Sequence, residues 1–294
     1  MKMRVIACFF LHPKSITVYL LGVVLWISPT DTLGQAQRAP DRGREAPEQA
    51  DAVARIIEVV DDPSASPRSF LLHGVTGSGK TEVYIQAIQH AVELGRQAIF
   101  LVPEISLTPQ TLERLTSRFP GRVAIIHSRL TPRQRFDQWW RIREGDYDVV
   151  VGPRSALFAP LPSLGLVVID EEHEWTYKQE EARPLYHARN VTLELSRLTG
   201  AVVLLGSATP DVETYHRAQR GGHRMLELPH RVPAPDSRTT PGLAQVEICD
   251  MRRELREGNR SIFSRRLAQA LRDCVKTGRQ AILFLNRRGS APIV

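Results

Sequence analysis

The loop that begins at Gly74 carries the residue types that bind phosphate groups. Its sequence is Gly74-Val75-Thr76-Gly77-Ser78-Gly79-Lys80-Thr81. Glycines let the backbone curl so that its N–H groups point at phosphate oxygens, and a helix starting there adds partial positive charge. We expect Lys80 to reach the β- and γ-phosphates and the Thr81 hydroxyl to coordinate Mg²⁺. The loop therefore predicts a nucleotide and Mg²⁺, but kinases, transporters and GTPases share it.

Acidic residues follow the apolar run 166–169. The sequence there reads Asp170-Glu171-Glu172-His173. A buried parallel strand would deliver these residues beside the phosphate loop, because open α/β sheets bind ligands at the carboxyl ends of their strands. Asp170 is then the expected Mg²⁺ partner, Glu171 the general base that polarises water, and His173 a relay of the γ-phosphate state. Acids also cap helix starts, and for Glu172 and His173 this second interpretation is equally good.

Small hydroxyl residues follow the apolar run 201–206. Ser207 and Thr209 flank Ala208 there and are placed to hydrogen-bond the acidic residues. We assign both, together with His173, to coupling between the nucleotide and the rest of the chain. The tripeptide alone would indicate only a turn.

Short apolar runs with β-branched residues alternate with helical patterns, which predicts an α/β fold built on a parallel sheet. The expected strands cover residues 69–73, 97–102, 123–127, 148–152, 166–170 and 201–206, and the first expected helix covers 81–94. Prolines mark a break at about 229–242. Beyond it, residues 246–249, 264–277 and 281–285 resemble the start of another α/β domain. We predict a leader and linker over 1–46, a nucleotide-binding domain over 47–230 and a partial second domain over 231–294.

The amino-terminal residues allow three interpretations. Lys2 and Arg4 precede the apolar runs 5–11 and 16–27, and the second run is shorter than the ~20 residues of a spanning helix. The segment is a non-native leader that results from a misassigned start or a truncated gene, a real signal or anchor, or a buried apolar segment. The three dispersed cysteines contain no CxxC pair, which argues against a disulfide framework and favours a cytoplasmic location. The net charge of +7 permits a polyanionic partner without requiring one.

The order of phosphate loop, Asp-Glu-x-His and Ser-Ala-Thr is the signature of superfamily 2 helicases. Longer strings resemble the PriA-type family of replication-restart helicases: HGVTGSGKTEVY, LVPEISLTPQ, VGPRSALFAP, VIDEEH, YHARN and ILFLNRRG. The resemblance covers roughly residues 47–290. It implies a RecA-like P-loop NTPase domain followed by the incomplete start of a second RecA-like domain. It also implies an ATP-dependent DNA helicase that moves 3′ to 5′ on single-stranded and forked DNA, with primosome and single-strand-binding proteins as partners.

The resemblance assigns further residues. Gln49 matches the family's adenine-contacting glutamine, and Arg154 and Ser155 match residues that track single-stranded DNA. The family's aromatic-rich loop, which couples DNA binding to ATP hydrolysis, corresponds here to Trp175, Tyr177, Lys178, Tyr186, His187 and Arg189. Aromatic rings stack on bases and cations hold phosphates. Trp139 and Trp140, in contrast, are expected to form a packed helix face.

The sequence also departs from the family. The first 46 residues do not resemble its amino-terminal DNA-binding region, and Ser290 replaces a usual aromatic residue. Arg183-Pro184-Leu185 stands where fewer residues are expected. The cysteines that bind zinc in the family, and its late arginine motif, are absent. We therefore expect the isolated chain to bind Mg·ATP weakly, to hydrolyse little of it and not to unwind DNA. The competing hypotheses are a catalytically inactive nucleotide- or DNA-binding module and a membrane-associated NTPase.

Overall fold

The computed structural model describes residues 4–11, 18–25, 46–103, 109–180, 183–232, 245–279 and 281–285. The chain divides into two compact units: Ala39–Ala234, and Met1–Arg38 together with Pro235–Val294. Most of the predicted leader and linker over 1–46 and most of the proline-rich break at 229–242 lie outside the described residues, as does everything after residue 285.

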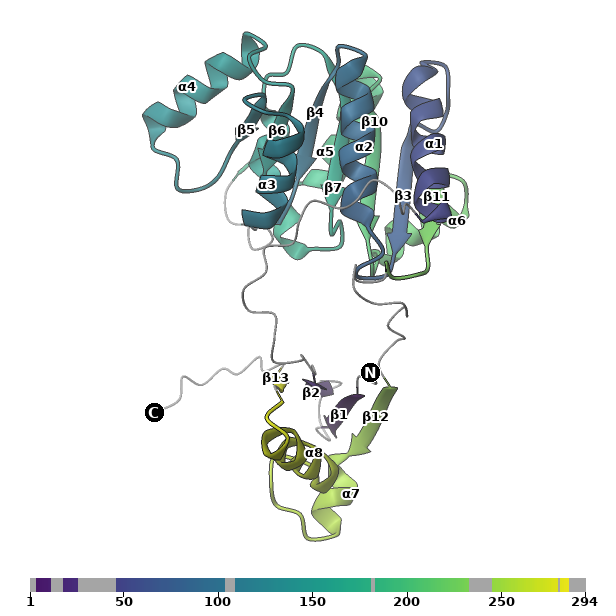
Figure 1. Ribbon diagram of the computed structural model, residues 1–294, viewed down its shortest axis with the longest axis vertical. Helices are drawn as coiled ribbons and strands as arrows, with labels where there is room; N and C mark the ends of the chain where they lie inside the picture. The colour runs from purple at the N-terminus through teal and green to yellow at the C-terminus, as the bar shows by residue number, and fades with distance from the viewer. Residues whose placement is uncertain are drawn as a thin grey trace. The chain divides into compact units, whose positions relative to one another are not determined.

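A parallel sheet of seven strands forms the centre of the larger unit (Figure 1). The strand order is β11-β3-β10-β7-β4-β6-β5, and every neighbouring pair is parallel. The strands are β3 (Ser69–Gly74), β4 (Gln97–Leu101), β5 (Val123–Ile125), β6 (Val149–Gly152), β7 (Leu164–Asp170), β10 (Val202–Ser207) and β11 (Arg224–Leu228). The predicted α/β class and parallel sheet are confirmed.

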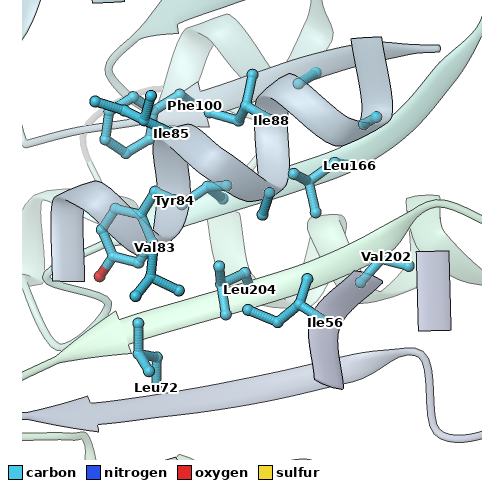
Figure 2. Packing of buried hydrophobic residues seen from close by; sticks show 14 of the residues in the cluster. Ile56, Leu72, Val83, Tyr84, Ile85, Ile88, Phe100, Leu166, Val202 and Leu204 are labelled. Carbon is cyan, nitrogen blue, oxygen red and sulfur yellow. The ribbon is translucent and has the colours of Figure 1, made fainter. Parts of the chain in front are cut away.

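Helices cover both faces of this sheet because the side chains of each strand alternate between two cores. Leu72, Phe100, Leu166 and Leu204 face helices α1 (Pro47–Asp61), α2 (Lys80–Glu93) and α3 (Pro109–Arg118). Figure 2 shows Val83, Tyr84, Ile85 and Ile88 of α2 packed on these strands, with Ile56 of α1 beside them. The opposite core contains residues of α5 (Ala188–Thr199) and α6 (Val212–Gln219).

Helix α4 (Pro132–Arg143) differs from the others because Ile142 is its only buried residue. Trp139 and Trp140 are 38% and 40% exposed. The expectation that they form a packed helix face is therefore wrong. The amino terminus of the helix is nevertheless well capped. Thr131 accepts a hydrogen bond from the Gln134 N–H, and Pro132 occupies the first turn.

The sheet order brings together motifs that lie far apart in the sequence. Strand β10 lies between β3 and β7, so the ends of the three strands are neighbours. The phosphate loop follows β3, the acidic residues follow β7, and Ser207 ends β10. Two 3₁₀ helices, η2 (Arg154–Phe158) and η3 (Trp175–Tyr177), and the short antiparallel pair β8 (Lys178–Gln179) and β9 (Tyr186–His187) lie beyond the strands.

The smaller unit contains a four-stranded sheet in the order β12-β1-β2-β13. Its elements are β1 (Arg4–Leu11), β2 (Val18–Leu25), β12 (Gln245–Asp250), α7 (Met251–Arg256), α8 (Arg265–Lys276) and β13 (Ile282–Leu285). Both apolar runs of the amino terminus are thus strands, paired with each other and with the carboxy-terminal segment. Among the described residues, no helix is long and apolar enough to cross a membrane.

Candidate active site

The phosphate loop is a tight turn that only glycine can form at two positions. Gly77 and Gly79 have φ values of 81° and 87°, the left-handed region that side chains disfavour. A Cβ atom at Gly79 would also lie 2.1 Å from Nε2 of Gln49. The Lys80 side chain is buried, and its ammonium donates a hydrogen bond to the Gly74 carbonyl oxygen at 2.9 Å. The cation is thus held over the loop.

The interior of the loop suits a phosphate group. Within the described part of the chain, the Ser78 hydroxyl is buried and has no hydrogen-bond partner. A Cβ atom at Gly74 would lie 2.6 Å from this hydroxyl and 3.2 Å from the Lys80 side chain. An unpartnered hydroxyl, a buried cation and a helix amino terminus converge where a bulkier residue would fill the space. These are the groups that bind phosphate oxygens.

Gln49 lies against the same loop from helix α1. Its Nε2 donates to the Ser78 carbonyl oxygen at 2.7 Å, and its Oε1 accepts from the Ala46 N–H at 3.4 Å. The buried side chain therefore connects the start of α1 to the turn before Lys80. Its contact with adenine, expected from the resemblance, stays a prediction.

Asp170 ends β7, and its carboxyl group has a perturbed pKa. Burial, reinforced by the negative charge of Glu171, raises the pKa of Asp170 to about 6. A hydrogen bond from the Tyr84 hydroxyl, at 3.1 Å from Oδ1, and the nearby charge of Lys80 act in the opposite direction. Thr81, the second predicted magnesium ligand, lies half-buried in the first turn of α2. Among the described residues, no group of three or more His, Cys, Asp or Glu could hold a metal ion by itself.

Two tyrosines position Asp170. The Tyr84 hydroxyl reaches its carboxylate, and the Tyr177 hydroxyl donates to its main-chain oxygen at 2.7 Å. Burial raises the pKa of both hydroxyls well above the usual range, so both remain donors. Gly206 makes room for the first, because a Cβ atom there would lie 1.6 Å from the Tyr84 hydroxyl oxygen. Tyr84 was not among the predicted site residues, although its place one helical turn after Lys80 puts both side chains on one face.

Tyr177 requires a correction. The resemblance assigned it to DNA, but its side chain is 1% exposed and belongs to the core. The 3₁₀ helix η3 directs Tyr177 inward, whereas Trp175 is 76% exposed. Tyr177 thus connects the aromatic loop to the strand end that bears Asp170.

Glu171 has an unusual backbone conformation. Its φ of 46° lies in the left-handed region, which is strained for a residue with a side chain, and its N–H donates to Oδ1 of Asp170 at 3.1 Å. Its carboxylate lies 3.6 Å from Nδ1 of His173. The side chain is partly exposed.

The three predicted coupling residues lie together. Nδ1 of His173 is 2.7 Å from the Ser207 hydroxyl, and Nε2 of His173 is 3.5 Å from the Thr209 hydroxyl. The Thr209 N–H donates to the Ser207 hydroxyl at 2.9 Å. These contacts connect the acidic turn after β7 to the end of β10.

Arg189 also requires a correction. The resemblance assigned it to DNA, but its side chain is 8% exposed. Its guanidinium lies 2.9 Å from the buried Glu172 carboxylate and 2.6 Å from the Thr214 hydroxyl. Glu172 also accepts from the Asp211 N–H at 2.7 Å. The cluster joins the acidic turn to the starts of α5 and α6, and its residues are not presented to a ligand.

The remaining predicted DNA contacts lie at the surface beside the strand ends. Ser155, Trp175 and Lys178 are exposed, and Tyr186 is half-buried with its ring 5.3 Å from that of Phe158. Lys178 forms an ion pair with Glu180 at 2.7 Å. Arg154 donates to the carbonyl oxygens of Thr176 and Lys178, at 2.6 and 3.2 Å. Arg154 therefore supports the aromatic loop, and its contact with phosphate stays a prediction.

A parallel α/β sheet with a phosphate loop, an Asp-Glu strand end and a Ser-x-Thr turn on neighbouring strands defines a P-loop NTPase of the helicase type. The DEAD/DEAH box helicase family model matches residues 46–218. The chain belongs to this family.

The relatives that the chain matches are replication restart proteins. The chain is 48% identical over 247 residues to the "Replication restart protein PriA" of Bacillus subtilis (strain 168), covering 84% of this chain and 30% of the relative. It is 42% identical over 272 residues to the protein of the same name from Synechocystis sp., covering 91% of this chain and 32% of the relative. The chain thus spans about a third of the length of these relatives, and the resemblance to replication-restart helicases is confirmed.

A solved structure supports the fold. "Structure of RecG bound to three-way DNA junction" matches with a TM-score of 0.50 and 26% identity. The match covers 68% of this chain and 25% of that chain. The predicted RecA-like helicase fold of the larger unit is confirmed.

Proposed function

We propose that this chain is the nucleotide-binding motor part of a 3′ to 5′ DNA helicase of replication restart. In this proposal it couples Mg·ATP hydrolysis to movement on single-stranded DNA at forks. The observation that carries the proposal is the convergence of Lys80, Asp170 and Ser207 at three neighbouring strand ends. The similarity to the replication restart proteins supports the choice of substrate.

The groups that would bind ATP lie in the phosphate loop and at the end of β7. The loop Gly74–Thr81 offers its N–H groups to the phosphates, with Lys80 as the fixed cation. The hydrogen bond from Lys80 to the Gly74 carbonyl oxygen is the one that the ammonium would exchange for a phosphate oxygen. Thr81 and Asp170 would hold Mg²⁺, which neutralises phosphate charge when bound. Glu171 would take the proton from the attacking water.

The coupling route begins at the acidic turn. His173, Ser207 and Thr209 form one hydrogen-bonded group next to Glu171, so a change around the γ-phosphate is transmitted to the end of β10. Tyr177 provides a second route, because it joins Asp170 to the loop that exposes Trp175. Single-stranded DNA would stack on Trp175 and contact Arg154, Ser155, Lys178 and Tyr186.

Partners and compartment follow from the same proposal. We infer single-stranded and forked DNA as the polymer substrate, and primosome and single-strand-binding proteins as partners, by resemblance to the relatives. A cytoplasmic location agrees with the need for ATP and DNA. The resemblance implies zinc in the full-length family protein. The proposal assigns no zinc ligand among the described residues of this chain.

Two substitutions test the nucleotide site. We expect Lys80→Ala to abolish binding of a fluorescent ATP analogue, because the loop loses its only cation. We expect Glu171→Gln to keep that binding and to lose residual hydrolysis, since the amide cannot take a proton. Lys276→Ala, at an exposed lysine of the smaller unit, is the control and should change neither quantity. Hydrolysis by Glu171→Gln at the parental rate would show that another group is the base.

A further measurement separates a motor from a catalytically inactive binding module. We expect single-stranded DNA to stimulate the ATPase rate, and Trp175→Ala to reduce this stimulation without changing nucleotide affinity. An ATPase rate that is unaffected by single-stranded DNA would favour the inactive module.

A further inference from the structure

Helix α4 carries aromatic side chains that the rest of the larger unit does not cover. Phe136, Trp139 and Trp140 are 60%, 38% and 40% exposed, and their spacing places them on one side of the helix. The Trp140 ring is 5.3 Å from that of Trp139 and 6.1 Å from that of Phe136, so the three form one cluster. Contiguous exposed apolar groups of this kind mark binding surfaces on soluble domains.

The same helix is strongly basic. It contains Arg133, Arg135, Arg141 and Arg143 against the single acid Asp137. The guanidinium of Arg143 lies 5.2 and 5.6 Å from the centres of the Trp140 and Trp139 rings. Arg133 and Arg135 are exposed and form no ion pair within the part of the chain that the structure describes. Basic and aromatic groups together complement a polyanion that has exposed ring faces.

The path from the strand ends to α4 is short. Helix α4 follows the edge strand β5, where the Ile126 N–H donates to the Val151 carbonyl oxygen at 2.8 Å. Val151 lies in β6, three residues before Arg154, one of the proposed DNA contacts. Figure 1 shows α4 projecting past β5, away from the layered body of the unit. A polymer that crosses the strand ends at Arg154 and Trp175 can therefore continue along α4.

We propose that α4 is a second binding surface for single-stranded DNA, which extends the path of the strand beyond the edge of the sheet. This inference rests on the proposed function. Unpaired bases would stack on Phe136, Trp139 and Trp140, while Arg133 and Arg135 would contact phosphates. The helix is about 18 Å long, enough for several nucleotides. A duplex does not fit this role, because its bases are already stacked.

The test is a comparison of oligothymidylates of about 6 and about 20 nucleotides, a range that spans the usual site sizes. Affinities of the parent chain for both are measured by fluorescence anisotropy. We expect the longer oligonucleotide to bind more tightly. We expect Trp140→Ala to weaken its binding about five-fold or more while leaving the shorter one unchanged. Tryptophan fluorescence gives a second readout, because the longer oligonucleotide should quench Trp139 and Trp140 as well as Trp175 and therefore quench more than the shorter one.

A variant at two exposed arginines tests the same surface with less risk of disturbing the fold than Trp140→Ala. Arg133→Gln/Arg135→Gln removes two exposed charges without touching the aromatic cluster. We expect it to reduce the slope of log affinity against log salt by about 0.7 per lost contact, for the longer oligonucleotide only. Arg256→Gln/Arg260→Gln, two exposed arginines of the smaller unit, is the matched control with the same change of charge.

The outcomes are distinguishable. If the shorter oligonucleotide binds but both α4 variants bind the longer one like the parent, the inference is overturned and α4 is left as a protein-docking surface. If Trp175→Ala does not weaken the shorter oligonucleotide, the DNA track of the proposed function fails instead. A selective loss of affinity for the longer oligonucleotide in both α4 variants supports the inference.

Discussion

At the scale of single residues, Asp170, the proposed Mg²⁺ ligand, illustrates the cost of burying a carboxyl group. Its side chain is buried beside Glu171, and its pKa is about 6 rather than the ordinary value of 3.8. A raised pKa means that the folded protein binds the proton more tightly than the unfolded chain. The associated stability is therefore complete below pH 3.8 and is lost as the pH rises through about 6. Mg²⁺ near the carboxylate would offset this loss.

The pH dependence of stability follows from this sign. In buffer without Mg²⁺ or nucleotide, we expect Asp170→Asn to be more stable than the parent at pH 8 and to lose that advantage towards pH 4. The shift corresponds to about 3 kcal/mol in the free energy of unfolding, an upper value because the substitution also changes the hydrogen bond to Tyr84. Urea unfolding at several pH values measures it. A stability difference that is constant between pH 4 and pH 8 would contradict the assignment.

The Tyr84 hydroxyl should matter for magnesium. Because its hydrogen bond favours the ionised form of Asp170, Tyr84→Phe raises the pKa of that carboxyl further. We expect the Mg²⁺ concentration that half-saturates nucleotide binding to rise several-fold near pH 6.5. The parental value should return at higher pH. Titration of Mg²⁺ against a fluorescent ATP analogue checks this result. Tyr215→Phe removes a half-buried hydroxyl elsewhere in the same unit and should behave like the parent.

The sequence indicated which motif residues lie together better than it indicated their supporting contacts. The phosphate loop and Asp170-Glu171 follow from residue type and spacing, because phosphate and Mg²⁺ binding require particular groups. Tyr84 and Tyr177 could not be recognised in this way, since a tyrosine on an apolar helix face or in an aromatic loop has many uses. Their roles depend on which hydroxyl lies opposite Asp170, and only the tertiary structure decides that.

At the scale of elements, the buried ion pair of Arg189 and Glu172 fixes the acidic turn to two helices. Arg189 is in the first turn of α5, and Thr214 and Asp211 are at the start of α6. We expect Arg189→Met to lower the free energy of unfolding by about 3–5 kcal/mol, because it leaves the Glu172 carboxylate buried and uncompensated. The double variant Glu172→Gln/Arg189→Met should recover much of this loss. Urea unfolding of the parent, of Arg189→Met, of Glu172→Gln and of the double variant measures the coupling. A double variant no more stable than Arg189→Met would show that the charge is not the cause.

Strand positions were easier to predict than strand neighbours. The runs that became β3, β4, β6, β7 and β10 are apolar on both faces, as a sheet covered twice requires. The edge strand β11 was missed because it contains Arg224 and Glu227 among its apolar residues. The order β3-β10-β7 depends on long-range pairing that no local pattern contains. Helix α4 was misjudged for a similar reason, since its aromatic pattern is that of a buried helix.

At the scale of the whole molecule, the two units differ in how many of their described residues form a buried apolar core. The larger unit has two extensive cores, whereas the described core of the smaller unit consists of Met251, Leu267 and Cys274. Exposed apolar residues of its strands include Val246, Ile248 and Ile282, at 64%, 67% and 54%. Since buried apolar area is the main source of stability, the smaller unit is expected to open more readily than the larger one.

The cysteines make this difference measurable, because all three lie in the sequence of the smaller unit and Cys274 is buried there. A Cys8→Ser/Cys249→Ser variant leaves Cys274 as the only thiol, and a Trp26→Phe change leaves tryptophans only in the larger unit. We expect Cys274 to react with a thiol reagent at urea concentrations well below the tryptophan fluorescence transition, because the small core opens first. Saturating Mg·ATP should move the fluorescence transition to higher urea, since a ligand stabilises the unit that binds it, and should leave thiol reactivity unchanged. Coincident thiol and fluorescence transitions, shifted together by nucleotide, would instead show that the chain unfolds as one cooperative body.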